Sequence, residues 1–204
     1  GFDSDEPILL AGSTHDPEEM ALLEVYESLR KVHANLRLVL VPRHPERATE
    51  LTKRIEEQGH PVVRRSTWAK HSTLHPAPNH PTPPVFLVDT IGELGNLYAI
   101  ADLVFIGGSL IDHGGQNVLE PAGAGKPVLI GPSYRNFREE VERLQDVGAL
   151  RIVQNTTDLE GHLTTLLENG ELRQNMGHRG QEALSDLRGA SAVNARRISK
   201  FLHP

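Results

Sequence analysis

Two pairs of glycines interrupt the stretch GGSLIDHGGQNVLEP, residues 107–121, which begins at the end of an apolar run. Glycine has no side chain, so the backbone at these positions can turn sharply or approach a ligand closely. The glycines concerned are Gly107, Gly108, Gly114 and Gly115. The residues after Asn117 are typical of a helix start, where unpaired amides and the positive end of the helix dipole suit an anionic phosphate. The stretch therefore indicates either a tight loop or a phosphate-binding loop.

Asn117 and Glu120 are three residues apart at this predicted helix start. In one interpretation they form an N-cap with its acidic partner three residues on. In the other, the Glu120 carboxylate accepts both hydroxyls of a ribose, as acidic residues do in dinucleotide-binding folds. Both tasks compete for the same oxygens, and we favour ribose binding. The candidate nucleotide-binding segment is then Asn117, Val118, Leu119 and Glu120.

Two further candidates follow other apolar runs. Arg43 comes directly after Pro42 at the end of one run, with a second proline two residues on. Its planar guanidinium could bind a phosphate through two hydrogen bonds, and a solvated arginine is the alternative. Gly92 and Glu93 follow another run and resemble a second helix start with exposed amides. These residues predict ligand contacts at strand ends.

Two histidines and a serine complete the set of candidates. His113 stands between Asp112 and the second glycine pair, where it could donate to a phosphate or act as an acid. An ordinary histidine on a surface loop is the alternative. Ser13 and His15 follow the first apolar run and carry the same ambiguity. N-capping by Ser13 or Thr14 is the structural interpretation there.

Several classes of function are excluded or disfavoured by what the sequence lacks. No G-x-G-x-x-G follows the first apolar run and no G-x-x-x-x-G-K-[ST] occurs, which argues against a nicotinamide enzyme and a P-loop ATPase. The net charge of -6 gives no basic footprint for nucleic acid. His71, His75 and His80 lie among prolines in a predicted loop at 67–84, so we expect neither a metal site nor a cofactor.

The candidates all sit where predicted strands give way to predicted helices. Near-continuous apolar runs of strand length alternate with segments of helical period, which predicts a parallel sheet covered on both faces. The predicted strands are 7–12, 36–41, 61–66, 85–89, 101–108, 126–131 and 149–153. The predicted helices are 16–32, 45–59, 93–100, 117–124 and 136–147, with helical pattern over 156–202 broken at 169–170. We therefore expect one α/β domain, doubly wound, with its ligand at the carboxyl ends of the strands.

Four motifs together resemble the C-terminal, donor-binding domain of the 3-deoxy-D-manno-octulosonic acid (Kdo) transferases, which are GT-B glycosyltransferases. They are AGSTHDPEE (11–19), LVLVPRHPER (38–47), DTIGELGNLYAIADLVFIGGSL (89–110) and HGGQNVLEPAGAGKPVLIGP (113–132). The resemblance implies a Rossmann-like half of a GT-B fold. It also implies transfer of Kdo from CMP-Kdo to a lipid A precursor in lipopolysaccharide core synthesis.

The resemblance also implies which residues hold the donor. Cytidine monophosphate would lie against Pro42 and Arg43, and the backbone near Ile91 and Gly92 would meet cytosine, with Glu93 beside them. Glu120 would hold the ribose. The remaining implied contacts, to the nucleotide or to Kdo, are Asn117, Val118, Leu119, Ser13, His113, Gly114, Gly115 and Gln116.

In this family a membrane-anchored N-terminal domain binds the acceptor and supplies the catalytic base, and nothing in residues 1–204 corresponds to it. We therefore expect 1–204 to be the C-terminal domain of a longer protein, with no catalytic residue of its own and no transfer activity alone. The full protein is expected at the cytoplasmic face of the bacterial inner membrane. This part is expected to be soluble and cytoplasmic, with membrane contact only through the other half.

Two other interpretations remain open at this point. The chain could be a nucleotide-binding module without catalysis, or a GT-B sugar-nucleotide epimerase that uses a UDP-sugar. A preference between CMP and UDP would separate the epimerase from the Kdo transferase.

Overall fold

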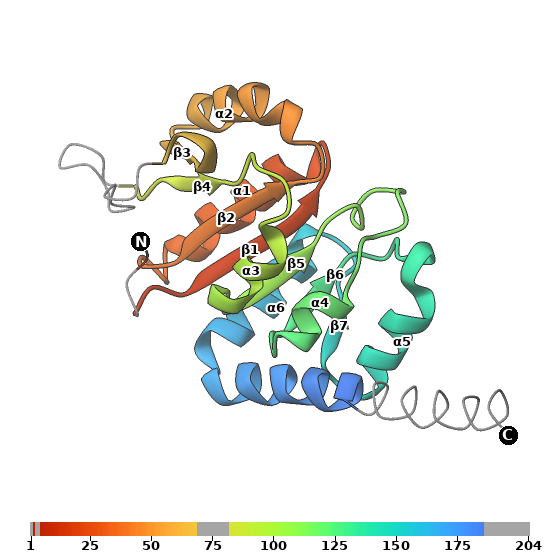
Figure 1. The fold of residues 1–204 in the computed structure, drawn as a ribbon. Helices are drawn as coiled ribbons and strands as arrows, with labels where there is room; N and C mark the ends of the chain where they lie inside the picture. The colour runs from red at the N-terminus through yellow and green to blue at the C-terminus, as the bar shows by residue number, and fades with distance from the viewer. Residues whose placement is uncertain (1, 3–4, 69–81, 186–204) are drawn as a thin grey trace, which may run out of the picture.

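The computed structural model describes residues 2, 5–68 and 82–185. Seven strands in this part of the chain form one sheet in which every neighbouring pair is parallel, in the order β3-β4-β2-β1-β5-β6-β7 (Figure 1). The strands are β1 (Ile8–Thr14), β2 (Arg37–Pro42), β3 (Val62–Arg64), β4 (Val85–Leu87), β5 (Leu103–Ile106), β6 (Val128–Ile130) and β7 (Leu150–Ile152). The predicted doubly wound parallel sheet is confirmed.

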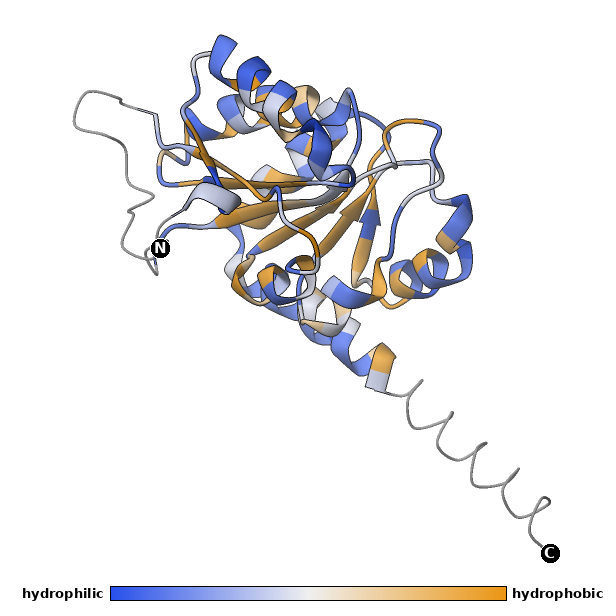
Figure 2. Ribbon diagram, turned by 45° about the horizontal axis from the view of Figure 1, so that its top comes forward, coloured by the Kyte–Doolittle hydropathy of each residue, from blue (hydrophilic) through white to orange (hydrophobic). Residues whose placement is uncertain are grey.

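Helices cover both faces of the sheet, as the apolar strands require. One layer contains α1 (Glu18–Arg30), α2 (Ala48–Glu57) and α6 (Thr156–Glu168); the other contains α3 (Leu94–Leu97), α4 (Leu119–Gly123) and α5 (Arg138–Asp146). Alternate residues of β1 enter the two cores: Leu9 packs on the side of α1, and Leu10 packs on the side of α5. Figure 2 shows hydrophobic strands in the middle and largely hydrophilic outer faces on the helices. Burial of each such leucine contributes about 1.5–3 kcal/mol.

The strand order changes direction at one place, between β1 and β5. From β1 the chain builds β2, β3 and β4 on one side, and then returns to place β5, β6 and β7 on the other. The connections after β1 and β5 therefore leave the sheet toward opposite faces at its carboxyl edge. Such a switch point is where open α/β sheets bind ligands.

Several predicted boundaries differ from the observed ones because local hydrogen bonds end or begin an element. The predicted helices at 45–59, 93–100 and 136–147 each combine an α-helix with a 3-10 turn. These turns are η1 (Pro45–Arg47), η3 (Tyr98–Ile100) and η4 (Arg135–Phe137). The predicted strand at 61–66 ends at Arg64 and continues as η2 (Arg65–Thr67), where Ser66 donates to Asp89.

The predicted break near 169–170 is confirmed. α6 ends at Glu168, and a further helix starts at 170 and continues to 185, the last described residue. The Asn169 side chain accepts the Leu172 N–H at 2.9 Å, which caps the new helix. The rest of the predicted helical segment, and the three histidines at 71, 75 and 80, lie outside the described residues.

Candidate functional site

The loops after β1 and β5 touch at the switch point, and Gly107 makes this contact possible. The Gly107 N–H donates to the Gly12 carbonyl at 2.9 Å. A side chain on Gly107 would place its Cβ 2.5 Å from the Thr14 Cα and 2.6 Å from the Ser13 oxygen. Only glycine fits, because real Cβ atoms do not approach backbone so closely. The first glycine pair of the 107–121 stretch thus brings two loops together.

A buried carboxylate from α1 fills the bend that follows. The Glu18 side chain accepts the N–H groups of Gly108, Ser109 and Leu110 at 2.6, 2.9 and 2.9 Å. It also accepts the His15 N–H at 3.0 Å, and only 1% of Glu18 is exposed. Successive backbone N–H groups that converge in this way form a concave anion site. We call Gly108–Leu110 the amide nest; it is occupied by an anion of the protein itself.

This role of Glu18 was not predicted from the sequence. An acid in the first turn of a helix is a common dipole-stabilising feature and usually faces solvent. Both carboxylates are buried, however. Glu19 accepts the Thr14 hydroxyl at 3.1 Å and the Arg47 guanidinium at 3.0 Å. The only available signal was a pair of acids directly after a strand-end loop, which does not by itself indicate burial.

The expected capping of α1 by Ser13 or Thr14 is wrong. The helix has Pro17 at its N-cap and no side-chain capping bond. Thr14 instead bonds to Glu19, inside the helix. Ser13 has a φ of 56°, which a non-glycine residue adopts rarely, and its carbonyl faces the His15 ring. The loop after β1 is therefore shaped by Glu18 and Glu19 rather than by a cap.

Three imidazoles from three strand-end loops lie together at this edge of the sheet. The His15 and His113 rings have their centroids 4.1 Å apart and are tilted by 38°. His44, from the loop after β2, meets His15 edge-on with a centroid distance of 5.7 Å. Burial, the nearby His113 and, to a smaller extent, His44 lower the pKa of His15, although Glu18 opposes the shift. The structure thus places His15 in contact with both His113 and His44, a grouping that the sequence alone does not predict.

Arg43 is exposed and has no acceptor for its side chain in the described part of the chain. Its backbone N–H donates to the Thr14 carbonyl at 2.9 Å, which fixes the start of this loop against β1. Pro42 is buried at the end of β2. The structure therefore presents Arg43 beside the loop after β1, with its guanidinium free.

The capping box considered as the alternative for Asn117 and Glu120 is absent, and the helix begins two residues later than predicted. The Asn117 side chain accepts the Leu119 N–H at 2.9 Å and donates to Glu120 Oε1 at 3.0 Å. α4 starts at Leu119, with Val118 at the N-cap and buried. Glu120 is exposed, and its Oε2 has no hydrogen-bond donor among the described residues. Asn117 therefore orients Glu120 and leaves one carboxylate oxygen unused.

Gly114 and Gly115 are buried, and their N–H groups are already bonded within the protein. Gly114 donates to the Ser133 hydroxyl at 2.9 Å, and Gly115 donates to the Gly108 carbonyl at 2.8 Å. Gly114 has a φ of 102°, and a Cβ there would meet the Asn136 amide at 2.6 Å. Their own amides thus do not point to a ligand. The N–H groups of Gln116, Asn117 and Val118 have no acceptor within the described residues.

The loop after β4 places Ile91 and Gly92 at the surface. Ile91 is 88% exposed, and Gly92 has a φ of 85°. Glu93 accepts the Thr90 hydroxyl at 2.5 Å and the Arg65 guanidinium at 2.8 Å. The Thr90 hydrogen bond and, to a smaller extent, Arg65 hold the pKa of Glu93 below its ordinary value, although burial opposes this shift. Glu93 therefore holds the loop, and an apolar side chain is left open to solvent.

This loop approaches the start of α4. A Cβ on Gly95 would lie 3.8 Å from Glu120 Oε2, and a Cβ on Gly12 would lie 3.3 Å from the Leu94 side chain. The nearby Glu120 carboxylate also adds to the effect of burial in raising the pKa of Tyr98. Residues 91–95 and Glu120 thus lie side by side over the end of β1. The structure brings these two predicted segments together.

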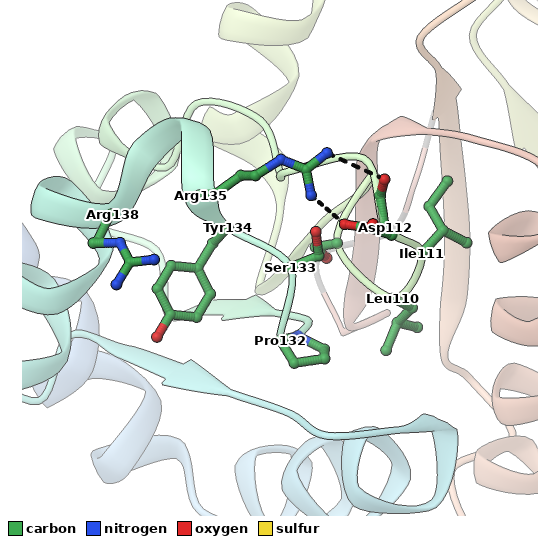
Figure 3. Close-up of a pocket in the computed structure, with 9 residues that line it drawn as sticks. Leu110, Ile111, Asp112, Pro132, Ser133, Tyr134, Arg135 and Arg138 are labelled. Carbon is green, nitrogen blue, oxygen red and sulfur yellow. Dashed lines mark hydrogen bonds and ion pairs between the residues drawn. The ribbon is translucent and has the colours of Figure 1, made fainter.

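A hollow of about 410 Å3 opens beside the second glycine pair, between the loops after β5 and β6. Figure 3 shows Arg135 reaching across its upper part to Asp112, with Tyr134 and Arg138 on the same side as Arg135. Ser109, Leu110, Ile111, Pro132 and Ser133 complete the lining. Arg138 has no ion-pair partner among the described residues. Polar and apolar groups thus share this hollow.

The described ranges contain neither a metal site nor a membrane-spanning helix. No cluster of three or more histidine or acidic side chains there could hold a metal ion. Within the same ranges, no helix combines the length and the hydrophobicity needed to span a bilayer.

Residues 84–183 match the family model "Glycosyl transferases group 1". The chain is 39% identical over 187 residues to a 3-deoxy-D-manno-octulosonic acid transferase of Haemophilus influenzae, which covers 91% of this chain and 42% of that protein. The chain therefore spans less than half the length of this curated relative.

Two solved structures have the same fold. The C-terminal CMP-Kdo binding domain of WaaA from Acinetobacter baumannii is 30% identical, with a TM-score of 0.79 over 89% of this chain and 90% of that domain. Anabaena Alr3699/HepE, solved in complex with UDP and glucose, has a TM-score of 0.62 at 16% identity, over 98% of this chain and 48% of that protein. The second likeness concerns the fold alone.

Proposed function

The chain belongs to the 3-deoxy-D-manno-octulosonic acid transferase family, and we propose that it is the donor-binding half of such a glycosyltransferase. Residues 1–204 then bind CMP-Kdo, and the full protein transfers Kdo to a lipid A precursor. The likeness to a CMP-Kdo binding domain over nine tenths of that domain supports the choice of donor.

One structural observation carries the proposal: unpaired groups for each part of a nucleoside monophosphate lie on the strand-end loops. The free Arg43 guanidinium and the N–H groups of Gln116–Val118 can bind a phosphate. Glu120 Oε2 can accept ribose hydroxyls while Asn117 holds the other oxygen. The loop at Ile91 and Gly92 offers exposed backbone and an apolar surface to the cytosine ring, and Glu93 holds this loop through Thr90 and Arg65. Pro42 is buried at the end of β2, directly before Arg43.

The occupied amide nest limits where the phosphate can bind. Glu18 already uses the N–H groups of Gly108–Leu110, so a phosphate placed there would meet a buried negative charge. The loop therefore favours one phosphate near Arg43 and the amides after Gly115. Val118 and Leu119 serve this arrangement by anchoring α4, Val118 through its buried side chain and Leu119 through its backbone N–H and a partly buried side chain.

In the reaction, an acceptor hydroxyl attacks the anomeric carbon of Kdo, the bond from that carbon to the phosphate oxygen breaks, and CMP leaves. Negative charge develops on the leaving phosphate, where Arg43 and the free amides stabilise it. The proton of the acceptor hydroxyl goes to a general base that we assign to the acceptor-binding half. Residues 1–204 contribute donor binding and charge stabilisation, and no metal or cofactor takes part in this proposal.

The proposal extends to the rest of the protein. The lipid A precursor and the membrane are contacted through an N-terminal acceptor domain, at the cytoplasmic face of the bacterial inner membrane. This half is then a soluble, cytoplasmic domain. No nucleic acid partner is proposed.

Calorimetric titration with CMP, UMP and AMP tests the proposal. We expect CMP to bind with a dissociation constant of roughly 0.1–1 mM, or about 4–5.5 kcal/mol. The double variant Arg43→Ala, Glu120→Gln should lose at least about 10-fold in CMP affinity, because a charged hydrogen-bond partner is removed on each side. The control variant Lys53→Ala, Glu57→Gln alters an exposed ion pair on α2 and should bind as the wild type does. Equal affinity for all three nucleotides, unchanged in the double variant, would contradict the proposal.

A further inference from the structure

His15 carries a buried nitrogen without a partner at the edge of the proposed donor site. The residue is 9% exposed, and its Nδ1 lies 3.1 Å from the Ser13 carbonyl oxygen. A carbonyl only accepts, so Nδ1 carries the proton in this contact. In the neutral ring Nε2 is then a bare acceptor, and it has no hydrogen-bond partner in the described part of the chain. A buried polar atom left without a partner calls for an explanation.

His113 covers His15 from the loop after β5. The centroids of the His113 and His15 rings are 4.1 Å apart, and both rings pack against Gly108. A Cβ there would meet His113 Cδ2 at 3.1 Å and His15 Nδ1 at 3.3 Å. Unlike His15, whose Nε2 is buried, His113 is exposed, so a ligand from solvent can reach the pair on the His113 side. We call His15 and His113 the imidazole pair.

The charged groups around the imidazole pair indicate what an anionic ligand would need in order to bind there. The titratable groups that face His15 are His113 from the β5 loop, His44 from the β2 loop and Glu18 from α1. The negative charge of Glu18 is already met by the amide nest. Because Glu18 uses the N–H groups of the amide nest, an anion at the imidazole pair cannot bind to them. It requires a positive charge or another N–H donor nearby.

A proton on Nε2 supplies both. Burial and the neighbouring His113 lower the pKa of His15, so the free protein holds this ring neutral at neutral pH. An anion beside the pair stabilises the imidazolium and raises the same pKa. The proton and the anion then favour each other's binding.

We propose that the imidazole pair is a binding site for an acidic group of the donor, with proton uptake at His15 Nε2 as the anion binds. The inference rests on the proposed function, because it concerns the donor held at the same loops. The acidic group is either the phosphate or the carboxylate of an acid sugar. The site differs from Arg43 and Gln116–Val118 in that its charge depends on pH.

The expected pH dependence follows from the direction of the shift. Because the free protein has the lower pKa and the complex the higher one, protons are taken up between the two values. Donor affinity therefore rises as the pH falls toward 6, and it levels off once His15 is protonated in the free protein as well. Once the pH exceeds the pKa of the complex, the ring is neutral in both states and the pair contributes least.

The test is calorimetry with CMP-N-acetylneuraminate, a CMP-linked acid sugar whose phosphodiester does not titrate near neutrality. Titrations at pH 7 in two buffers of different ionisation enthalpy count the protons taken up, and we expect about 0.5–1 per site. His15→Asn and His113→Asn should reduce this uptake and lower the affinity at pH 6 by about 10-fold. His33→Asn, at the opposite edge of the sheet, is the matched control. His113→Asn changes an exposed loop residue, so it keeps the test valid if His15→Asn unfolds.

A parallel titration with CMP separates the two sources of the acidic group. The CMP phosphate itself titrates with a pKa of about 6. The proton uptake of His15→Asn is therefore subtracted from that of the wild type, and this difference is compared between the two ligands. Uptake with both ligands assigns the phosphate, and uptake with the acid sugar alone assigns the carboxylate. Cytidine-selective binding with no proton uptake, unchanged in both histidine variants, would overturn the inference and leave the proposed function intact. Failure of both cytidine ligands to bind would overturn the two together.

Discussion

At the scale of single residues, the site depends on which polar groups are used within the protein and which are free. Arg43 and Glu120 were predicted from strand-end position and residue type, and each keeps a free group. The role of Glu18 was not predictable, because an acid in the first turn of a helix usually faces solvent. Its burial depends on the amide nest, which is 90 residues away in sequence. Contacts of that range are set by the fold rather than by local pattern.

Glu18→Gln tests the nest directly. A glutamine amide is neutral and directs N–H groups toward donors, so it cannot accept all four backbone hydrogen bonds. We expect the free energy of unfolding to fall by about 2–4 kcal/mol. Urea denaturation followed by circular dichroism measures this change, with Glu24→Gln on the exposed face of α1 as the control. A loss below about 0.5 kcal/mol would show that the nest does not need the carboxylate.

At the scale of elements, the apolar runs predicted all seven strands and most helices, because a strand buried on both faces must be apolar. Element ends were less predictable. α4 starts at Leu119 because the Asn117 side chain takes the Leu119 N–H, and β3 gives way to η2 where Ser66 bonds to Asp89. In both places a side chain competes with the regular backbone pattern. The close approach of the loops after β1 and β5 likewise depends on a tertiary contact, at Gly107.

Gly107→Ala should therefore separate these two loops. The added Cβ would lie 2.5 Å from the Thr14 Cα, and backbone must move to relieve the clash. We expect an unfolding free energy lower by about 1–3 kcal/mol, together with weaker CMP binding. Gly161→Ala, in the middle of α6 with nothing within 4 Å of its Cβ, should instead stabilise the fold by about 0.5–1 kcal/mol. Equal melting curves for the two variants would be inconsistent with the close contact.

Asp89 joins the end of β4 to η2, and its effect should depend on pH. Although burial opposes ionisation, hydrogen bonds from Ser66 and Arg64 hold the pKa of Asp89 below its ordinary value of 3.8. Because the folded state has the lower pKa, the stabilisation is fully present above the unfolded pKa and is lost as the pH falls through the folded one. Asp89→Asn should cost about 1–3 kcal/mol at pH 7, and the difference from wild type should shrink below pH 4. A difference that stays constant from pH 7 to pH 3 would exclude this contribution.

At the scale of the whole molecule, the sheet order decides where the site lies. The alternation of strands and helices predicted a doubly wound sheet, but the reversal between β1 and β5 is visible only in the fold. The parallel strands place the histidines, the glycine loop and Arg43 on one edge, and the reversal locates the switch point on that edge between β1 and β5. The chain spans 42% of the length of the Haemophilus influenzae relative. In our proposal, an acceptor half completes the site.

This division predicts that residues 1–204 bind the donor but do not transfer Kdo. Without a base from the acceptor half, the attacking hydroxyl keeps its proton and the chemical step is slow. Incubation of the chain with CMP-Kdo and a lipid A precursor, followed by mass spectrometry, should show no product. The full-length protein in the same assay should show it. Transfer by residues 1–204 alone would mean that the catalytic base lies in this chain.

The most direct measurement of the central claim is a crystal structure of this chain with CMP. We expect the phosphate within about 3.2 Å of the Arg43 guanidinium and the N–H groups of Gln116–Val118, with the ribose hydroxyls on Glu120. Glu18 should remain in the amide nest. A phosphate seated on the N–H groups of Gly108–Leu110 with Glu18 displaced, or CMP bound away from the switch point, would contradict the account.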